Sequence, residues 1–338
     1  MPPATLFRQT SPPARMSSRS KVLVVALGGN AIKQADESGT AEEQLRNIRA
    51  TCRHILEMIR DGYTVIITHG NGPQVGNLML QQEGGGKIVP PQPLDILGAM
   101  TQGQIGYMIQ QTLMNYLREA GGELSKTPVV TIVTQVLVDK NDPEFIGENA
   151  TKPVGPFYYE RQAMGLRKQR GYLVKKVKPT GNRPWRRVVP SPDPIAIIEK
   201  DAVRQLVNAG AVVVASGGGG IPVISEGRSL AGVEAVIDKD LAGECLAEAA
   251  DADILLILTD VDKVALNYGK PNQRALDRMS LVEAKRYLEE GHFLPGSMGP
   301  KVKACIRFLE AGGEQAMITS LDLAGPALKG EAGTLITR

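Results

Sequence analysis

Short apolar strands that end in glycine-rich or Thr-Asp turns recur along this chain, and they constrain its fold more than any other feature. The four clearest strands, each with its turn, are residues 21–27 before Gly28-Gly29-Asn30, 63–68 before His69-Gly70-Asn71-Gly72, 211–215 before Ser216-Gly217-Gly218-Gly219-Gly220, and 253–258 before Thr259-Asp260. Continuous apolar strands that alternate with helical patterns predict an α/β fold, with a parallel sheet covered on both faces. Ligands bind beyond the carboxyl ends of such strands, so we expect these turns to share the active-site edge.

The remaining pattern predicts further elements around this sheet. Residues 41–60 form an amphipathic helical pattern, because Leu45, Ile48, Cys52 and Ile55 recur on one face. A helix is expected to begin at Pro73, since proline is favoured in a first helical turn. The other expected elements are a long helix over residues 94–119, a third strand over 128–138, and short strands at 316–319 and 334–337.

The charge of the chain is uneven although its sum is small. The 338 residues carry a formal net charge of +3, which equals the contribution of Arg8, Arg15 and Arg19 in a Pro- and Ser-rich start that lacks acidic residues. We interpret residues 1–20 as a disordered leader and residues 21–338 as one domain. The body is neutral, so its total charge gives no reason to expect a nucleic-acid or membrane partner.

The cysteines and the hydropathy pattern favour a cytosolic protein. Cys52, Cys245 and Cys305 are isolated and odd in number, which suggests neither a disulfide framework nor a zinc site. A reducing cytosol fits this usage best. No apolar run approaches the roughly 18–20 residues that span a bilayer, so no membrane association is expected.

Residues 141–190 interrupt the alternation of strands and helices. This segment is rich in proline, contains Trp185, and carries ten basic residues and one acidic residue between Glu160 and Arg187. We interpret it as an insertion outside the main sheet that forms a small protruding subdomain. A basic lid that attracts anionic substrates, or a plain solvated surface, would both explain its charge.

Two lysines stand where stability alone would not place them. Lys239, followed by Asp240, and Lys301, after Gly299 and Pro300, each lie at an expected helix start, where a cation opposes the helix dipole. Glycine turns let backbone N–H groups approach an anion, and lysines neutralise a phosphoryl group in transfer. The combination predicts phosphate chemistry. The chain lacks the P-loop motif, and its glycine spacing argues against a dinucleotide-binding dehydrogenase.

Ten motifs in order along residues 21–338 resemble the carbamate kinases of the amino-acid kinase superfamily. They are ALGGNAI, THGNGPQVG, LGAMTQGQIGYMIQQ, TKPVGPFY, RRVVPSPDP, SGGGGIPV, GVEAVIDKDLA, LTDVD, NYGKP and GHFLPGSMGPK. The resemblance implies a three-layer αβα sandwich with a mainly parallel sheet of about eight strands, assembled as a homodimer. It also implies reversible transfer of a phosphoryl group between ATP and carbamate, with Mg²⁺ accompanying ATP or ADP. In the family this usually makes ATP from carbamoyl phosphate in arginine catabolism.

The resemblance also assigns roles to individual residues. Lys239 and Lys301 match the family's phosphate-binding lysines, and Asp240 matches the aspartate that orients them. Residues that match the carbamate side are Gly28, Gly29, Asn30, Gly70, Asn71 and Gly72, and those that match the nucleotide side are Gly217, Gly218, Gly219, Thr259, Asp260, Tyr268 and Met298. Amino-acid kinases generally keep a lysine at the end of the first strand, where this chain has Ala26. Lys140 in VDKNDP is the expected replacement. No metal ligand is assigned to a side chain.

Two other readings compete with this one. A different amino-acid kinase, acting on acetylglutamate, glutamate or isopentenyl phosphate, would need a larger pocket and would be expected to keep the first-strand lysine. The basic stretch of residues 160–187 is also compatible with a nucleic-acid-binding or regulatory protein on the same fold. That segment holds few aromatic residues and no recognition helix, which disfavours this alternative.

Overall fold

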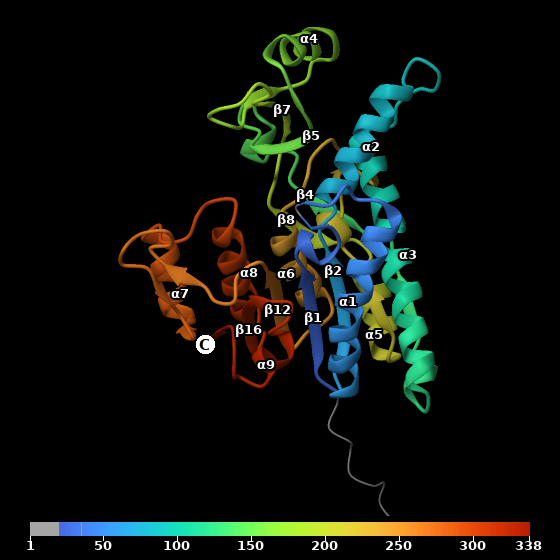
Figure 1. Cartoon of the computed structure of the whole chain (residues 1–338), viewed down its shortest axis with the longest axis vertical. Helices are drawn as coiled ribbons and strands as arrows, with labels where there is room; N and C mark the ends of the chain where they lie inside the picture. Colours follow the sequence, from blue (N-terminus) through green and yellow to red (C-terminus); the bar gives the residue numbers. More distant parts are fainter. Residues whose placement is uncertain (1–19, 35) are drawn as a thin grey trace, which may run out of the picture.

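The computed structural model describes residues 20–34 and 36–338, and an eight-stranded sheet forms its centre (Figure 1). Neighbouring strands pair in parallel except β16 and β17, which pair antiparallel. In spatial order the strands are β15 (Arg278–Ser280), β17 (Thr334–Thr337), β16 (Gln315–Ser320), β12 (Ile254–Thr259), β1 (Val22–Leu27), β2 (Thr64–His69), β9 (Val212–Val214) and β3 (Val129–Thr131). The predicted mainly parallel sheet is therefore confirmed. The expected leader, residues 1–20, lies outside the described residues apart from Ser20.

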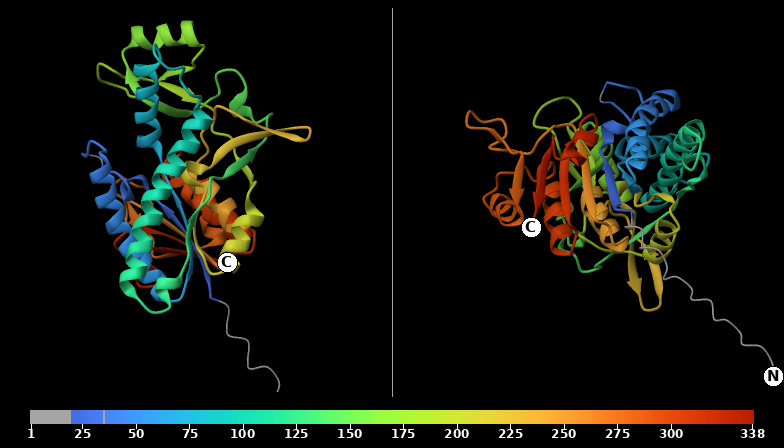
Figure 2. Two further views of the ribbon diagram at one scale, coloured as in Figure 1. Left: turned by 90° about the vertical axis from the view of Figure 1, so that its right-hand side faces the viewer. Right: turned by 90° about the horizontal axis from the view of Figure 1, so that it is seen from below.

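Helices cover both faces of this sheet (Figure 2). Alternate side chains of β1 enter two separate cores: Leu23 and Val25 pack with α1, α3 and α9, whereas Val22 and Val24 pack with α5, α6, α7 and α8. Burial on both faces explains the continuous apolar sequence of the strand. The helix bounds are α1 Ala41–Arg60, α3 Leu94–Ala120, α5 Lys200–Asn208, α6 Lys239–Ala249, α7 Leu281–Glu289, α8 Met298–Glu310 and α9 Ala324–Leu328. This arrangement confirms the three-layer sandwich.

The first helix begins where its sequence predicts. Thr40 precedes α1 and its hydroxyl accepts a hydrogen bond from the Glu43 N–H at 3.2 Å, while Glu43 Oε2 accepts from the Thr40 N–H at 2.9 Å. This capping box satisfies two N–H groups that a helix start leaves unpaired. The buried face then runs from Ile48 to Ile59, as the apolar spacing requires.

The expected single strand over residues 128–138 is wrong, because the chain divides it between two sheets. β3 lies at the edge of the main sheet, whereas β4 (Gln135–Val138) belongs to a second sheet with β11 (Ser229–Gly232), β10 (Ile221–Glu226) and β8 (Pro194–Ile197). Between them, Gln102 of α3 replaces a strand partner: its Oε1 accepts from the Thr134 N–H at 2.8 Å and its Nε2 donates to the Thr134 carbonyl at 3.1 Å. The apolar run continues through this bend, so its pattern does not reveal it.

Residues 152–189 form a separate small unit that projects from the main body (Figure 1). Its antiparallel sheet consists of β5 (Lys152–Tyr158), β7 (Trp185–Val189) and β6 (Val174–Lys176), and α4 (Glu160–Arg170) packs on it through Ala163. Helix α2 (Gly72–Gly85) extends from the main body alongside this unit, and the Tyr158 hydroxyl donates to Glu83 Oε1 at 2.7 Å. A short β13–β14 hairpin (Ala265–Leu266 and Arg274–Ala275) completes the strands of the described residues.

No helix in the described part of the chain is long and apolar enough to cross a membrane. All three cysteines are buried and unbridged.

Candidate active site

The four turns named from the sequence lie side by side at one edge of the main sheet. Leu27 at the end of β1 pairs with His69 at the end of β2, and β2 pairs in parallel with β9. On its other side, β1 pairs in parallel with β12, which ends at Thr259. Because these strands all point the same way, Gly28, Gly70, Gly217 and Asp260 follow strand ends along one continuous edge.

The glycines at this edge permit approaches that a side chain would prevent. Gly218 has φ +67°, and a Cβ there would lie 2.1 Å from the Asn71 side-chain nitrogen. A Cβ on Gly217 would lie 2.5 Å from Nε2 of His69. The Asn71 amide itself is held by α3, since its Nδ2 donates to the Thr101 hydroxyl at 2.8 Å. The turn after β9 is thereby packed directly on the turn after β2.

One carboxylate at the start of α6 holds two lysines. The Lys239 ammonium lies 2.6 Å from Asp240 Oδ1, and the Lys301 ammonium lies 2.8 Å from Asp240 Oδ2. Asp238 caps the helix by accepting from the Asp240 N–H at 3.0 Å. Lys301 reaches this point from the first turn of α8. Asp240 thus uses each oxygen for one lysine, and we call these three residues the lysine clamp.

The electrostatics of the clamp keep Asp240 ionised. Burial by itself would raise the pKa of Asp240, which is only 3% exposed, but the charges and hydrogen bonds of Lys239 and Lys301 outweigh it and lower that pKa. Nearby His69 is buried without an acidic partner. Burial and the positive charge of Lys239 lower the pKa of His69 to about 4, although its hydrogen bond to the Gly70 carbonyl opposes the shift. His69 is therefore neutral near pH 7.

The clamp lies between the two groups of residues that the sequence assigned to different substrates. On the carbamate side, a Cβ on Gly70 would lie 3.5 Å from Cδ of Lys239. On the nucleotide side, Lys301 follows Met298 by one helical turn. Met298 lines a cavity of about 100 Å³ together with Thr259, Asp260 and Tyr268. The structure therefore brings these four nucleotide-side residues together, along with Phe293 and Leu294, which the sequence reasoning did not select.

The glycines of the turn after β9 are placed differently. Gly217, Gly218 and Gly219 lie against His69, Asn71 and the Ile237 carbonyl, respectively. Gly218 also lines a cleft of about 510 Å³ that Asn71 and Gly72 share. These three glycines thus border the carbamate-side turn and the approach to α6, outside the cavity lined by Tyr268. Their predicted contact with the nucleotide stays a prediction.

Lys140 lies apart from the clamp. It follows β4, its side chain is exposed, and among the described residues it makes no ion pair. Its segment is nevertheless tied to the clamp's surroundings, because Asp142 Oδ2 accepts from the Asp193 N–H at 3.2 Å. Asp193 in turn bonds Lys303 and Arg307 of α8. The described structure thus links the segment of Lys140 to α8 through Asp193, and it shows no bond between Lys140 and Asp240.

The position at which related kinases carry a first-strand lysine is filled by Ala26. Ala26 is fully buried, and a Cβ added to Gly243 of α6 would lie 3.7 Å from the Cβ of Ala26. Helix α6 therefore packs closely on β1 at this point. A lysine at position 26 would have to displace this contact, which gives a physical reason for the departure from the superfamily pattern.

Lys152 is a residue that the sequence reasoning missed. It begins β5, and its ammonium lies 3.2 Å from Asp238 Oδ2, so it reaches from the protruding unit to the cap of α6. Lys152 also lines the 510 Å³ cleft opposite Asn71, with Val154 and Arg186 from the same unit. The signal was present in the motif TKPVGPFY, but a lysine before a strand proline has no local feature that indicates a partner 86 residues away.

Comparison with known proteins agrees with this geometry. A model described as the amino acid kinase family matches residues 21–320. The chain is 57% identical to carbamate kinase from Thermococcus kodakarensis and 54% identical to that from Pyrococcus furiosus, each over 94% of this chain and 99% of the relative. Carbamate kinase from Giardia lamblia bound to AMP-PNP has a TM-score of 0.88 and 42% identity, covering 95% of this chain and 99% of that one. The protein therefore belongs to the amino acid kinase family and, within it, to the carbamate kinases, which are phosphotransferases.

Proposed function

We propose that this protein transfers a phosphoryl group reversibly between ATP and carbamate, giving ADP and carbamoyl phosphate, through the residues gathered around the lysine clamp. The observation that carries the proposal is Asp240, which holds Lys239 beside the Gly70 turn and Lys301 one turn from the Met298 cavity. A phosphoryl group passing between those two places would stay in contact with both ammonium groups.

Transfer of a phosphoryl group to carbamate requires that the two substrates are positioned and that their negative charge is neutralised. Carbamate is already an anion, so its oxygen attacks the γ-phosphorus without a strong general base. The bond from that phosphorus to the bridging oxygen breaks, and ADP leaves with the electron pair. Lys239 and Lys301 stabilise the negative charge shared by the attacking and leaving oxygens. The N–H groups of the Gly28–Asn30 and Gly70–Gly72 turns are proposed to orient carbamate.

Magnesium is expected to arrive with the nucleotide. The described residues contain no group of three or more His, Cys, Asp or Glu side chains that could hold a metal ion. Mg²⁺ keeps several waters and uses few protein ligands, so we expect nucleotide phosphates to carry it. Asp260, which lines the Tyr268 cavity, is proposed to contact it. When bound, the ion neutralises phosphate charge.

The direct test is ATP formation from ADP and carbamoyl phosphate by the purified full chain, measured with a coupled assay. Activity is expected with Mg²⁺ and not after its omission. Lys239→Ala should lower kcat by about two to four orders of magnitude, since it removes a preorganised charge from the transition state. A folded variant with near-normal turnover would contradict the role of Lys239.

The same assay separates the competing functions. ATP and acetylglutamate, offered in parallel, should give no phosphoryl transfer if carbamate is the acceptor. Faster turnover of acetylglutamate than of carbamoyl phosphate would favour the other kinases of the family. Salt-dependent binding of RNA or DNA would support the nucleic-acid alternative, and we expect none at physiological salt.

We also propose that two copies associate through α3. Ile96, Met100 and Tyr107 are exposed along one stripe of this helix, and the exposed Val133 follows the adjoining edge strand β3. A row of apolar side chains on an edge of the main sheet is typical of an interface between identical subunits. Light scattering should show a dimer, and Tyr107→Arg should shift it toward the monomer. A wild-type monomer would contradict this assembly.

The physiological direction and compartment remain predictions. ATP formation in arginine catabolism is the direction that the family resemblance implies. The three buried free thiols support a reducing compartment such as the cytosol. Kinetic measurement in both directions tests the first prediction, and localisation of the full chain tests the second.

A further inference from the structure

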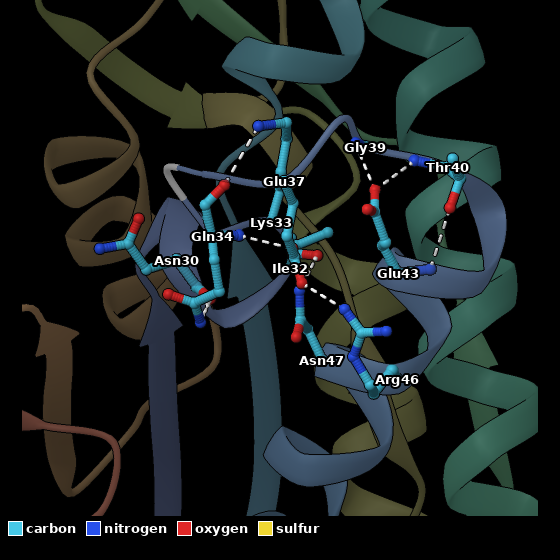
Figure 3. A network of polar contacts seen from close by, with 10 residues as sticks. All are labelled: Asn30, Ile32, Lys33, Gln34, Glu37, Gly39, Thr40, Glu43, Arg46 and Asn47. Carbon is cyan, nitrogen blue, oxygen red and sulfur yellow. Dashed lines mark hydrogen bonds and ion pairs between the residues drawn. The ribbon is translucent and has the colours of Figure 1, made fainter.

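The loop between β1 and α1 carries the Gly28–Asn30 turn, and Glu37 of this loop is bonded to side chains of α1 (Figure 3). Glu37 Oε2 accepts from the Gln34 N–H at 2.8 Å and from Asn47 Nδ2 at 2.6 Å. Glu37 Oε1 accepts from Arg46 at 2.7 Å. The Glu37 side chain is only 10% exposed, whereas Arg46 is 65% exposed. Glu37 is therefore the point at which the loop and the helix meet.

Side chains also hold three successive carbonyls of the turn. The Asn30 carbonyl accepts from Gln34 Nε2 at 2.8 Å, and the Ala31 carbonyl accepts from the Thr51 hydroxyl at 2.9 Å. The Ile32 carbonyl accepts from Asn47 Nδ2 at 3.2 Å. Two of these three donors, Gln34 and Asn47, belong to residues that also donate to Glu37. Glu37 thus orients Gln34 and Asn47, and these two residues in turn hold the carbonyls of Asn30 and Ile32.

The orientation of these carbonyls bears on the opposite side of the turn. Residues 29–31 form a single 3₁₀ turn, and the first N–H groups of such a turn have no partner within it. Each peptide is planar, so fixing its carbonyl direction fixes the direction of the N–H in the same peptide. The held carbonyls share their peptides with the N–H groups of residues 31–33, which donate to the Gly28 and Gly29 carbonyls at 3.0–3.2 Å. Those bonds fix the two peptides that contain the Gly29 and Asn30 N–H groups, so side-chain bonds to the back of the turn aim these two N–H groups at its front.

We propose that Glu37 is a positioning residue for the carbamate-binding turn, acting through Gln34 and Asn47 and without touching the substrate. This inference rests on the proposed function. It assigns to Glu37 control over affinity for the carbamoyl substrate and none over the nucleotide, whose cavity lies beyond β12 on the other side of β1. The hydrogen bond from the Gln34 N–H, followed by those from Arg46 and Asn47, keeps the pKa of Glu37 below its usual range, so it remains an acceptor at neutral pH.

The chain offers a graded series of variants. Glu37→Gln keeps the shape of the side chain but leaves one acceptor oxygen where three donors converge. Asn47→Ala removes both the bond to Glu37 and the bond to the Ile32 carbonyl. Arg46→Ala removes only the bond from the exposed Arg46 side chain to Glu37. Glu42→Gln is the matched control, because Glu42 is a nearby acid in the first turn of α1, is exposed, and makes no hydrogen bond through its side chain in the described structure.

The experiment measures the KM for carbamoyl phosphate, the KM for ADP, kcat and the melting temperature for each full-length variant. Glu37→Gln and Asn47→Ala should raise the KM for carbamoyl phosphate about tenfold, because small displacements of positioning groups have large kinetic effects. The KM for ADP should stay within about twofold of wild type. Arg46→Ala should change the first KM about twofold, and Glu42→Gln should change neither.

Two results would overturn the proposal. One is a Glu37→Gln enzyme with the same KM for carbamoyl phosphate as Glu42→Gln. The other is a parallel rise of both KM values that follows a fall in melting temperature, which would indicate a general structural role. Failure of the wild-type protein to make ATP would instead contradict the proposed function, so the two failures are distinguishable.

Discussion

Two successive turns of α6 carry buried acids whose pKa values are shifted in opposite directions. Asp240, in the first turn, is 3% exposed, and Glu244, one turn later, is 4% exposed. The two lysines of the clamp lower the pKa of Asp240 in spite of its burial. Burial raises the pKa of Glu244 to about 7, reinforced by Glu248 and Asp193, and Arg307 offsets this only in part because it is bonded to Asp193.

The difference shows that burial alone does not decide the charge of a carboxyl group here. A buried acid stays ionised where two cations are bonded to it, whereas one turn away, where none is bonded, burial raises the pKa. The first turn of α6 is therefore an arrangement of fixed charge, which suits the stabilisation of a phosphoryl group. The second turn carries a buried acid that makes no ion pair among the described residues.

The largest effect is expected from Asp240→Asn. It leaves two lysines without their shared anion, so kcat should fall by about two to four orders of magnitude and stability by about 3–5 kcal/mol. Because the folded pKa of Asp240 is lowered, its stabilisation is present above the unfolded value of 3.8 and lost as the pH falls through the folded pKa. The melting-temperature gap from wild type should therefore narrow in acid. Asp201→Asn, on the exposed start of α5, is the control; equal kcat values for both variants would contradict the clamp.

Lys140→Ala tests whether the clamp needs a third cation that is not bound to it. We expect kcat to fall about a hundredfold or more, as for loss of one preorganised charge. The melting temperature should stay unchanged, because Lys140 is exposed and makes no ion pair among the described residues. This combination would distinguish it from Asp240→Asn, which changes both quantities. Kinetics like those of wild type would show that another group supplies the charge, and Lys152 is then the first to test.

Glu244→Gln should stabilise the protein in a pH-dependent way. The raised pKa means that the folded state binds a proton that the unfolded state releases, so wild-type stability falls as the pH rises from the unfolded value of 4.5 to about 7. The variant lacks this loss. Its advantage in free energy of unfolding should be near zero below pH 4.5 and reach about 2–3 kcal/mol above pH 7. Denaturant titrations at pH 5 and pH 8 that give the same difference would show that Glu244 is not the group responsible.

The smallest effect is expected on α4 of the protruding unit, whose cations are exposed. Lys168 is exposed on α4 and makes no ion pair among the described residues, so Lys168→Glu should change kcat less than about twofold. Its kcat/KM for carbamoyl phosphate should fall slightly at low salt and recover at high salt, if the unit attracts anions at a distance. A large, salt-independent loss would mean that α4 contributes directly to catalysis.

Much of the fold could be predicted because local patterns and tertiary packing agree. The amphipathic spacing and the Thr40–Glu43 pair define α1, and continuous apolar runs define the strands buried on both faces. The strand expected over residues 128–138 was wrong because a side chain from α3, Gln102, takes the place of a neighbouring strand at Thr134. Apolar periodicity contains no information about such a substitute.

The residues of the candidate site likewise divide into those that the sequence indicated and those that it did not. Lys239 and Lys301 stood out because a cation at a helix start opposes the helix dipole, and Asp240 is adjacent in sequence to one of them. Lys152 did not stand out, since its contact with Asp238 depends on how the protruding unit returns to α6. The link from the segment of Lys140 to α8, through Asp142 and Asp193, likewise depends on residues far apart in the sequence, which no local pattern describes.

The single carboxylate shared by Lys239 and Lys301 also links the two substrates thermodynamically. A ligand that pulls one ammonium toward itself changes the bond that remains for the other, because both bonds end on Asp240. Any gain in nucleotide affinity caused by bound carbamoyl phosphate must then equal the gain in carbamoyl phosphate affinity caused by bound nucleotide. Asp240 is therefore a side chain that joins the two substrate sides by direct bonds.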